Sequence, residues 1–497
     1  MAEEKKATDD QGGAERKLVE ARLAESPRLS TGSVAVADDT VLKYRVSCEY
    51  LPVARYEFGE RRGEPQAAVF TAAYELDDHE PCHRPVCFAF NGGPGSASIW
   101  LHLGALGPKR VVVPDDGSVA APPFAIADNA LTWLKHFDLV FIDPPHTGWS
   151  IAAGDEARKQ LLSVDGDVAA MAEVVRVWLT RHRRWSSKLY LVGESYGTTR
   201  GAAMADALAN VGVGLSGLIL VSTAIDLQTI LFAPKNDLPY ATFLPAMAAA
   251  AQYHGKLKGR LAADPKTARN EAAAFVQEDY VKALFAGVRL SSAGRKRISR
   301  RLAELTGLST AVVEESNLRI DNMTFFFELL RDRGLQVGRL DSRSTSPMGA
   351  RRGRTFEFDP GVVAVASSFS MAAATYLRES LGVSEELRYD VLSMDTYTAW
   401  NWNRGKAQGN GFCTTSDDLA RAMRRNPHLR VLVASGHYDL GTPFSAIDWS
   451  LAQMDLTAEG MARIEHHYYD AGHMFYTRQA DLEKLERDLS GWLAAAE

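Results

Sequence analysis

A serine between two glycines is the best candidate for a catalytic residue in this chain. Ser195 is the central residue of GESYG at 193–197, between the apolar run LYLVG and the alanine-rich stretch GTTRGAAMADAL. A strand, a sharp turn and a helix in this order form a nucleophile elbow, in which glycines allow close approach and the start of the helix favours developing negative charge. We therefore predict that Ser195 is a nucleophile.

A serine hydroxyl attacks a carbonyl only when a base takes its proton and a carboxylate holds that base. Asp439 lies in GHYDLGTPF after the apolar run RVLVAS, and His473 lies in DAGHMFY after a further strand-like run. The order Ser195, Asp439, His473 is that of α/β hydrolases. The other candidates for these roles are more typical of turn-forming, core or rim residues: Asp470, His437, His466 and His467.

A glycine-rich segment, NGGPGSAS at 91–98, follows the apolar run VCFAF. Acyl transfer needs N–H donors aimed at the oxyanion, and such donors come from the residue after the nucleophile and from a loop after an earlier strand. We expect the backbone amides of Tyr196 and Gly93 to supply them, with Pro94 locking the turn. A tight turn without a catalytic role is the alternative.

These residues must be positioned by a layered α/β fold. Short apolar runs typical of parallel strands buried on both faces occur at 86–90, 139–143, 189–193, 218–222 and 430–435. Helical patterns lie between them, most clearly at 164–182. Alternating residues at 33–76 predict an antiparallel meander, so we expect a mostly parallel central sheet with antiparallel strands at its N-terminal edge.

The pattern predicts three parts. Residues 1–30 form a charged, disordered or partly helical tail, 31–225 and 396–497 form the α/β core, and 226–395, rich in Ala, Arg and Leu, form a helical cap or lid. The polar stretch DSRSTSPMGARRGRTF at 341–356 is expected to be a mobile loop within this insertion. The cap should cover the site and set the substrate preference.

Charge and hydropathy exclude several partners. The 56 basic and 62 acidic residues give a net charge of -6, which does not favour nucleic acid. No uninterrupted apolar run reaches the roughly 18 residues of a membrane span, and the charged N-terminus has no secretory signal, so we expect a cytoplasmic protein without membrane contact. The oligomeric state is left open.

The four cysteines of the chain form neither a disulfide framework nor a metal-binding pattern, so reduced thiols are the default interpretation. Cys82 and Cys87 are close in the sequence, so a disulfide bridge between them is the one alternative.

Several motifs occur together: NGGPGSAS, LGALGP, GESYG, SGHYDLGTPF and DAGHMFY, in this order. They resemble the serine carboxypeptidase family (peptidase family S10), in detail its bacterial members, from about residue 35 to the C-terminus and most weakly across the insertion. The resemblance implies an α/β-hydrolase fold with a helical cap, a Ser195, Asp439 and His473 triad, an oxyanion hole, proteolysis of peptide substrates from the C-terminus, and no cofactor or metal. The segment FIDPPHTGWS resembles a family loop near the site, is one residue shorter and carries His146; the matching residues are Asp143, Thr147 and Gly148.

The resemblance also implies a site for the terminal carboxylate of the substrate, at Asn91, Gly92 and Glu194. Two positions depart from the family pattern: Ala89 stands where the family usually has a tryptophan, and Ala105 stands where it usually has a glutamate. In the secreted eukaryotic members that glutamate pairs with the one before the serine and shares protons with it, which implies an acidic optimum. A single glutamate therefore predicts a near-neutral optimum.

A cation would be the better carboxylate receptor at neutral pH. Arg110 is the residue that we would test first, with Lys109 and Arg200 as alternatives. Because one recognition partner is missing, an esterase or acyltransferase remains the main rival to a carboxypeptidase, as plant relatives of the family include acyltransferases. A non-catalytic scaffold is a less favoured third interpretation.

Overall fold

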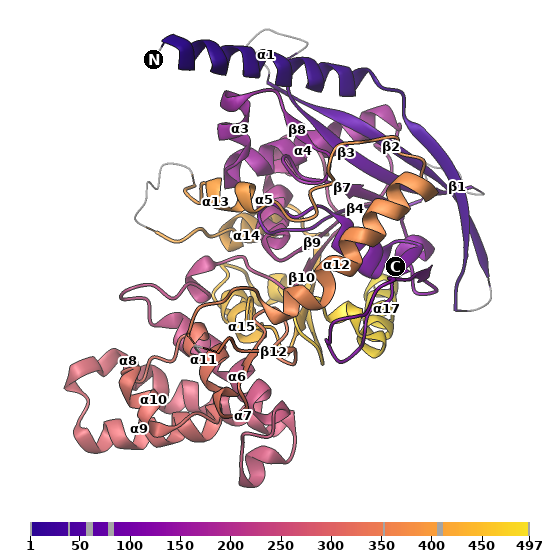
Figure 1. Ribbon diagram of the computed structural model, residues 1–497. Helices are drawn as coiled ribbons and strands as arrows, with labels where there is room; N and C mark the ends of the chain where they lie inside the picture. Colours follow the sequence, from indigo (N-terminus) through magenta and orange to yellow (C-terminus); the bar gives the residue numbers. More distant parts are fainter. Residues whose placement is uncertain are drawn as a thin grey trace.

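A large mixed sheet with helices on both faces forms the centre of the molecule (Figure 1). The computed structural model describes residues 2–37, 40–55, 63–77, 84–350, 353–404 and 411–495. For residues 2–12 and 55 the description covers the backbone alone. The expected α/β-hydrolase architecture is confirmed, with its antiparallel strands at one edge and its parallel strands carrying the motifs.

The strand order in the sheet is β1-β2-β3-β7-β4-β9-β10-β13-β14, with the short β8 paired to β3. The strands are β1 (Arg28–Ala35), β2 (Val41–Arg55), β3 (Glu64–Leu76), β4 (Val86–Phe90), β7 (Asp138–Ile142), β8 (Ile151–Ala152), β9 (Leu189–Glu194), β10 (Gly217–Val221), β13 (Arg430–Gly436) and β14 (Ile464–Tyr469). Pairs from β1 to β7 are antiparallel, and pairs from β7 to β14 are parallel. The predicted meander and parallel runs are therefore confirmed.

The alternation of side chains divides the interior into two cores. In β4, Val86, Phe88 and Phe90 contribute to the core on one face of the sheet, whereas Cys87 and Ala89 contribute to the core on the other face. All five side chains are buried, because parallel strands between two helical layers have no solvent face.

Helices cover both faces of this sheet (Figure 1). The first face carries α3 (Asp155–Leu161), α4 (Val164–Arg181), α5 (Tyr196–Asn210), α14 (Ser416–Arg425) and α15 (Phe444–Ala452). The second carries α2 (Ile99–Leu101), η2 (His102–Leu106), η3 (Trp133–Lys135), α12 (Pro360–Thr375), η9 (Tyr376–Ser380), η10 (Phe475–Thr477) and α17 (Gln479–Ala494). Two further elements of this part are α13 (Met394–Ala399) and α16 (Ala458–Met461).

The cap is a separate helical cluster beyond the end of the sheet (Figure 1). It contains η4 (Leu227–Thr229), α6 (Leu238–Tyr253), η5 (Gly259–Ala262), α7 (Pro265–Phe275), η6 (Val276–Tyr280), α8 (Val281–Ala286), η7 (Gly287–Arg289), α9 (Ser292–Thr306), α10 (Thr310–Glu315), α11 (Asn322–Glu328) and η8 (Arg331–Arg333). Its apolar core runs from Phe243 to Val337 and is joined by Leu440 and Phe444.

The insertion expected at 226–395 is thus divided between two places. Helix α12 belongs to the core of the α/β layer, where Phe369 packs on Trp100 with ring centroids 5.0 Å apart. The continuous helix Pro360–Ser380 is also the one helix, among the residues that the structure describes, long and apolar enough to cross a membrane, and half of that stretch is buried. Inspection of uninterrupted apolar runs missed it because serines and a glycine punctuate the helix.

The N-terminal segment, expected as a charged tail that is disordered or partly helical, forms helix α1 (Ala2–Ala24) along the outside of the meander (Figure 1). Val19 is fully buried against the core. Ion pairs join Arg22 to Glu385 and Glu15 to Arg158, the latter at 2.6 Å. Two of the charged residues of this segment therefore have partners in distant segments.

Two small hairpins complete the described structure, β5 (Lys109–Val111) with β6 (Ile126–Asp128) and β11 (Leu335–Val337) with β12 (Thr345–Pro347). The second lies partly within the stretch expected to be a mobile loop. In that stretch Arg343 is buried and pairs with Asp341 at 2.6 Å, so this part is ordered by a local ion pair.

The thiols of Cys48, Cys87 and Cys413 are free and buried. Cys82, the other half of the bridge left open by the sequence, lies outside the described residues.

Candidate active site

Ser195 lies at the turn between strand β9 and helix α5. Its φ of 59° and ψ of −128° place a non-glycine residue in a strained backbone conformation that is typical of a functional turn. Its N–H donates to the carbonyl of Val221 at 2.9 Å, which ties the turn to strand β10. A Cβ at Gly193 would lie 2.2 Å from the carbonyl oxygen of Gly197, so the turn requires glycine there. Ser195 is partly exposed while its neighbours are buried.

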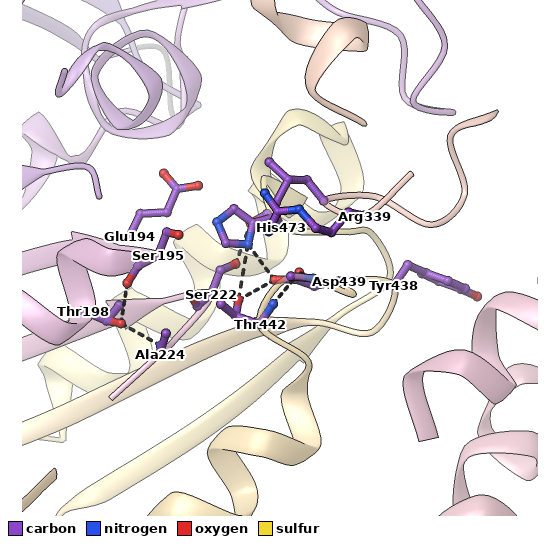
Figure 2. Close-up of polar contacts among 12 residues, drawn as sticks. Glu194, Ser195, Thr198, Ser222, Ala224, Arg339, Tyr438, Asp439, Thr442 and His473 are labelled. Carbon is purple, nitrogen blue, oxygen red and sulfur yellow. Dashed lines mark hydrogen bonds and ion pairs between the residues drawn. The ribbon is translucent and has the colours of Figure 1, made fainter. Parts of the chain in front are cut away.

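Asp439 and His473 meet beside this serine (Figure 2). The Nδ1 atom of His473 lies 2.7 Å from Oδ2 of Asp439. The Asp439 carboxylate also accepts hydrogen bonds from the N–H groups of Gly441 and Thr442, at 2.7 and 2.9 Å, and from the Thr442 hydroxyl at 2.7 Å. These donors satisfy a fully buried carboxylate and fix its orientation.

The electrostatics of the pair suit a base held by an anion. Burial works to raise the pKa of Asp439, but the nearby His473 and the Thr442 donors lower it overall. Burial works to lower the pKa of His473, but the Asp439 carboxylate raises it overall. The imidazole lies between Ser195 and Asp439 in Figure 2, so its second nitrogen remains for the serine.

The other acid and histidine candidates make contacts elsewhere. The backbone N–H of Asp470 donates to Asp481 at 3.1 Å, and the Asp470 side chain makes no described contact with His473. His437 stacks on Tyr468, and burial lowers its pKa to about 3. His466 and His467 pair with Asp448 and Asp488 respectively. Among these candidates, the structure thus leaves Asp439 as the described carboxylate partner of the His473 imidazole.

The glycine-rich loop after β4 packs directly on the elbow. A Cβ at Gly92 would lie 2.4 Å from the backbone nitrogen of Tyr196, and Gly93 has a φ of +99°, which favours glycine. The structure therefore brings Gly92, Gly93 and the Tyr196 amide together. The first N–H groups of a helix have no partner within it, so the Tyr196 amide at the start of α5 can serve an external acceptor.

Arg200 and Asp167 form a buried ion pair beneath the elbow, a structural role that the sequence alone does not reveal. Arg200 donates to Asp167 at 2.7 Å and to the carbonyl of Asn91 at 2.6 Å, while the Tyr196 hydroxyl donates to the same Asp167 at 3.0 Å. Arg200 is 1% exposed, so it links the elbow to the glycine-rich loop and is no free receptor for a substrate carboxylate.

Glu194 and Asn91 form a buried polar cluster next to the serine. The Asn91 amide donates to Glu194, and Oδ1 of Asn91 accepts from the N–H of Leu101 at 3.0 Å. The Tyr476 hydroxyl donates to both oxygens of Glu194, at 3.0 and 2.8 Å. Burial raises the pKa of Glu194 to about 7, partly offset by His473 and by the two donors.

Tyr476 packs against the short helical turn that carries Ala105. A Cβ at Gly104, in η2, would lie 2.5 Å from Cε2 of Tyr476, so the ring packs against this short helical turn. Ala105 is fully buried and Ala89 faces the core. The motif DAGHMFY contained this tyrosine, but no local pattern showed that its hydroxyl reaches Glu194.

The loop at 143–150 is tied to the glycine-rich segment through Asp143. The N–H and hydroxyl of Ser98 donate to Oδ1 of Asp143 at 2.9 and 2.8 Å, and Tyr389 donates to it at 3.1 Å. Burial raises the pKa of Asp143 to about 6 and lowers that of His146 to about 4. The carbonyl of His146 accepts from Thr396 at 3.1 Å, and Thr147 and Gly148 shape the same turn.

The two remaining cations proposed as carboxylate receptors have partners away from the triad. Lys109 pairs with Asp128 within the β5–β6 hairpin. Arg110 donates to Gln479 at the start of α17, and burial lowers its pKa. Neither contacts Ser195, Glu194 or His473 in the described structure, so the preference for Arg110 has no geometric support.

Within the described part of the chain, no group of three or more His, Cys, Asp or Glu side chains is arranged to hold a metal ion.

A family model described as serine carboxypeptidase (Peptidase_S10) matches residues 62–228, which include the glycine-rich loop and the elbow. Two similar relatives come from Arabidopsis thaliana. Serine carboxypeptidase-like 13 is 25% identical over 187 residues, covering 36% of this chain and 41% of the relative. Serine carboxypeptidase-like 33 is 28% identical over 137 residues, covering 27% of each. The alignments thus span less than half of the length of these relatives.

Among solved structures, the chain is similar to Kex1Δp, a prohormone-processing carboxypeptidase from Saccharomyces cerevisiae. The TM-score is 0.53 at 15% identity, covering 90% of this chain and 91% of that one. At this identity the likeness shows a shared fold.

Proposed function

We propose that the chain, whose residues 62–228 match a family model described as serine carboxypeptidase, is a serine hydrolase of that family that removes C-terminal residues from peptides. The observation that carries this proposal is the His473–Asp439 pair, with 2.7 Å between Nδ1 and Oδ2, beside the strained turn of Ser195. A histidine held in this way can accept a proton from the serine and return it to a leaving group.

The reaction follows from these positions. The Ser195 oxygen attacks the scissile carbonyl carbon while the second nitrogen of His473 takes its proton. The carbonyl oxygen becomes an oxyanion, which the N–H groups of Gly93 and Tyr196 would stabilise. The C–N bond then breaks, and His473 gives the proton to the leaving amine. Water, deprotonated by the same histidine, then attacks the acyl carbon. The ester bond to Ser195 breaks, His473 returns the proton to the serine oxygen, and the peptide acid is released.

We assign recognition of a free C-terminus to the cluster of Asn91, Gly92 and Glu194. With a pKa near 7, Glu194 is largely protonated below that pH and can donate a hydrogen bond to a substrate carboxylate. Tyr476 holds both of its oxygens in place. A single titrating glutamate supports the expectation of a near-neutral optimum.

An esterase or acyltransferase is the second candidate, favoured by one observation. The family's second glutamate is replaced by Ala105, so the carboxylate site has lost a partner while the acyl-transfer machinery is unchanged. The same triad can attack an ester and pass the acyl group to an alcohol. A non-catalytic scaffold would not need the Asp439–His473 pair.

Two measurements test the proposal. A fluorophosphonate probe should label the wild type and not Ser195→Ala, whereas Ser216→Ala, remote from the elbow, should be labelled like the wild type. Digestion of a peptide library between pH 4 and 9, read by mass spectrometry, should show loss of single C-terminal residues. Turnover of short acyl esters without any peptide cleavage would favour the second candidate, and absence of labelling would favour a scaffold.

A further inference from the structure

The guanidinium of Arg339 lies beside the triad, and its side chain has no hydrogen-bonding partner among the described residues. Arg339 follows strand β11, and its backbone is bonded on two sides: its carbonyl accepts from Leu440 at 2.9 Å, and its N–H donates to Asp359 at 2.9 Å. The carbonyl of the next residue, Leu340, accepts from the N–H of His473 at 2.6 Å. This part of the inserted segment is therefore fixed against both the acid loop and the catalytic histidine.

The side chain of Arg339 points over the acid loop. A Cβ on Gly441 would lie 3.0 Å from Nη1 of Arg339, and Figure 2 draws the arginine next to His473, while Tyr438 points away from both. Arg339 is also one of the groups that act electrostatically on the His473 imidazole. The guanidinium of Arg339 is thus close enough to the His473 imidazole to affect it electrostatically.

The guanidinium is unsatisfied in the described structure. Its one ion-pair contact is Asp359, with 3.7 Å between Nε and Oδ2, and no described hydrogen bond comes from its side chain. The Asp359 oxygens already accept from the N–H groups of Arg339, Leu340 and Gly361. With 45% of the side chain exposed, the planar donor face of Arg339 is accessible to a ligand.

From this geometry we infer that Arg339 forms an anion subsite of the active site, which binds a carboxylate of the substrate next to the scissile bond. The inference rests on the proposed function, because it names the chemistry of the substrate at the same site. A guanidinium binds a carboxylate through two parallel hydrogen bonds, a geometry that fixes position as well as charge. The other cations considered, Lys109, Arg110 and Arg200, are engaged elsewhere.

The carboxylate has two sources in a peptide: the free C-terminus, or an Asp or Glu side chain adjoining the cleaved bond. Four N-blocked peptides separate them, with Ala or Glu before the scissile bond and with a free or amidated C-terminus. The variants are Arg339→Gln, the charge-preserving Arg339→Lys, and the control Arg297→Gln, an exposed cap arginine in α9. p-Nitrophenyl acetate serves as the substrate without a carboxylate.

Arg339→Gln should lower kcat/KM by about 10- to 100-fold on the carboxylate-bearing arms, the size of a lost charge-assisted hydrogen bond. The loss on the ester and in fluorophosphonate labelling should be much smaller, limited to the electrostatic effect of Arg339 on His473, and Arg339→Lys should lose less. If kcat/KM falls only for the peptides with Glu before the scissile bond, the ligand is an acidic side chain. If it falls only for the peptides with a free C-terminus, the ligand is the α-carboxylate. An equal loss on the ester, or no loss beyond that of Arg297→Gln on any arm, would overturn the inference.

Inhibition of ester hydrolysis by N-acetylglutamate keeps the test independent of peptide cleavage. The wild type should be inhibited, and Arg339→Gln should need about tenfold more inhibitor. If the wild type hydrolyses the ester and cleaves no peptide, the proposed carboxypeptidase function fails while this comparison still decides the role of Arg339. Equal inhibition of the two proteins would contradict the proposed role of Arg339 in binding a carboxylate.

Discussion

The two halves of the proposed site, catalytic and recognition, are built in different ways. The catalytic half consists of sharp turns that follow neighbouring parallel strands, closed by backbone contacts such as the approach of Gly92 to the Tyr196 amide. The recognition half consists of side chains from distant segments, with Tyr476 on Glu194 and Arg339 above the acid loop. The difference teaches that, in the proposed site, chemistry is held by main-chain geometry, whereas the choice of substrate depends on side chains that can be exchanged.

The largest effect should come from the acid of the catalytic half. Asp439→Asn removes the charge that holds the His473 imidazole and stabilises its protonated form, so kcat should fall about 10⁴-fold. Steady-state kinetics on a small ester measures this without any carboxylate recognition. Asp470→Asn is the matched control, because its side chain does not contact His473, and it should stay within about twofold of the wild type. A larger loss for Asp470→Asn would reassign the acid.

A methyl group should break the backbone contact that closes the catalytic half. The Cβ of Gly92→Ala would lie 2.4 Å from the Tyr196 nitrogen, which displaces the loop or obstructs the oxyanion donor. We expect a loss of about 10²-fold in kcat. Gly214→Ala, where no heavy atom lies within 4 Å, is the control. Melting temperatures of both variants separate a catalytic loss from unfolding, and an unchanged kcat would contradict the role of this loop.

In the recognition half, pH should change KM rather than chemistry. Glu194 loses its proton as the pH rises through about 7, and the resulting carboxylate repels the carboxylate of a substrate. KM for peptides with a free C-terminus should therefore rise above pH 7, by up to about tenfold per pH unit. Glu194→Gln cannot titrate and should abolish this rise. Amidated peptides are the matched control, and a KM that rises equally for them would exclude Glu194 as the cause.

The smallest expected effect is a displacement of that pH dependence. The Tyr476 hydroxyl stabilises ionised Glu194, so Tyr476→Phe should raise the pKa of Glu194 further. The rise in KM should then begin about one pH unit higher, the value of one hydrogen bond to a charged group. Tyr469→Phe, whose hydroxyl donates to Asp488 at 2.8 Å, is the control. A shift to lower pH would contradict the contact.

Most of the catalytic half could be predicted from the sequence because its signals are local. Apolar runs before GESYG, NGGPG and GHYD predict strands ending at one edge, and parallel strands bring those ends together in space. The structure pairs Asp439 with His473 as this reasoning expects. The meander and the parallel strands follow equally from residue periodicity.

The errors concern segments whose environment is set by distant residues. The N-terminal charges predicted a solvated tail, yet Arg22 of α1 finds Glu385 more than three hundred residues away. Arg110 was favoured as a receptor by its position after LGALGP, and packing directs it to Gln479 instead. The polar stretch around Arg343 is ordered by Asp341 and by strand pairing.

The sequence by itself determined the strand-turn-helix elements, the order of serine, acid and histidine, and the two alanines that depart from the family pattern. Only the tertiary structure decided which side chains surround them: Tyr476 on Glu194, Arg200 beneath the elbow, and Arg339 beside the imidazole. The physical reason is that turns and periodicity are encoded by adjacent residues, whereas the partners of a buried polar group are selected by the packing of the whole chain.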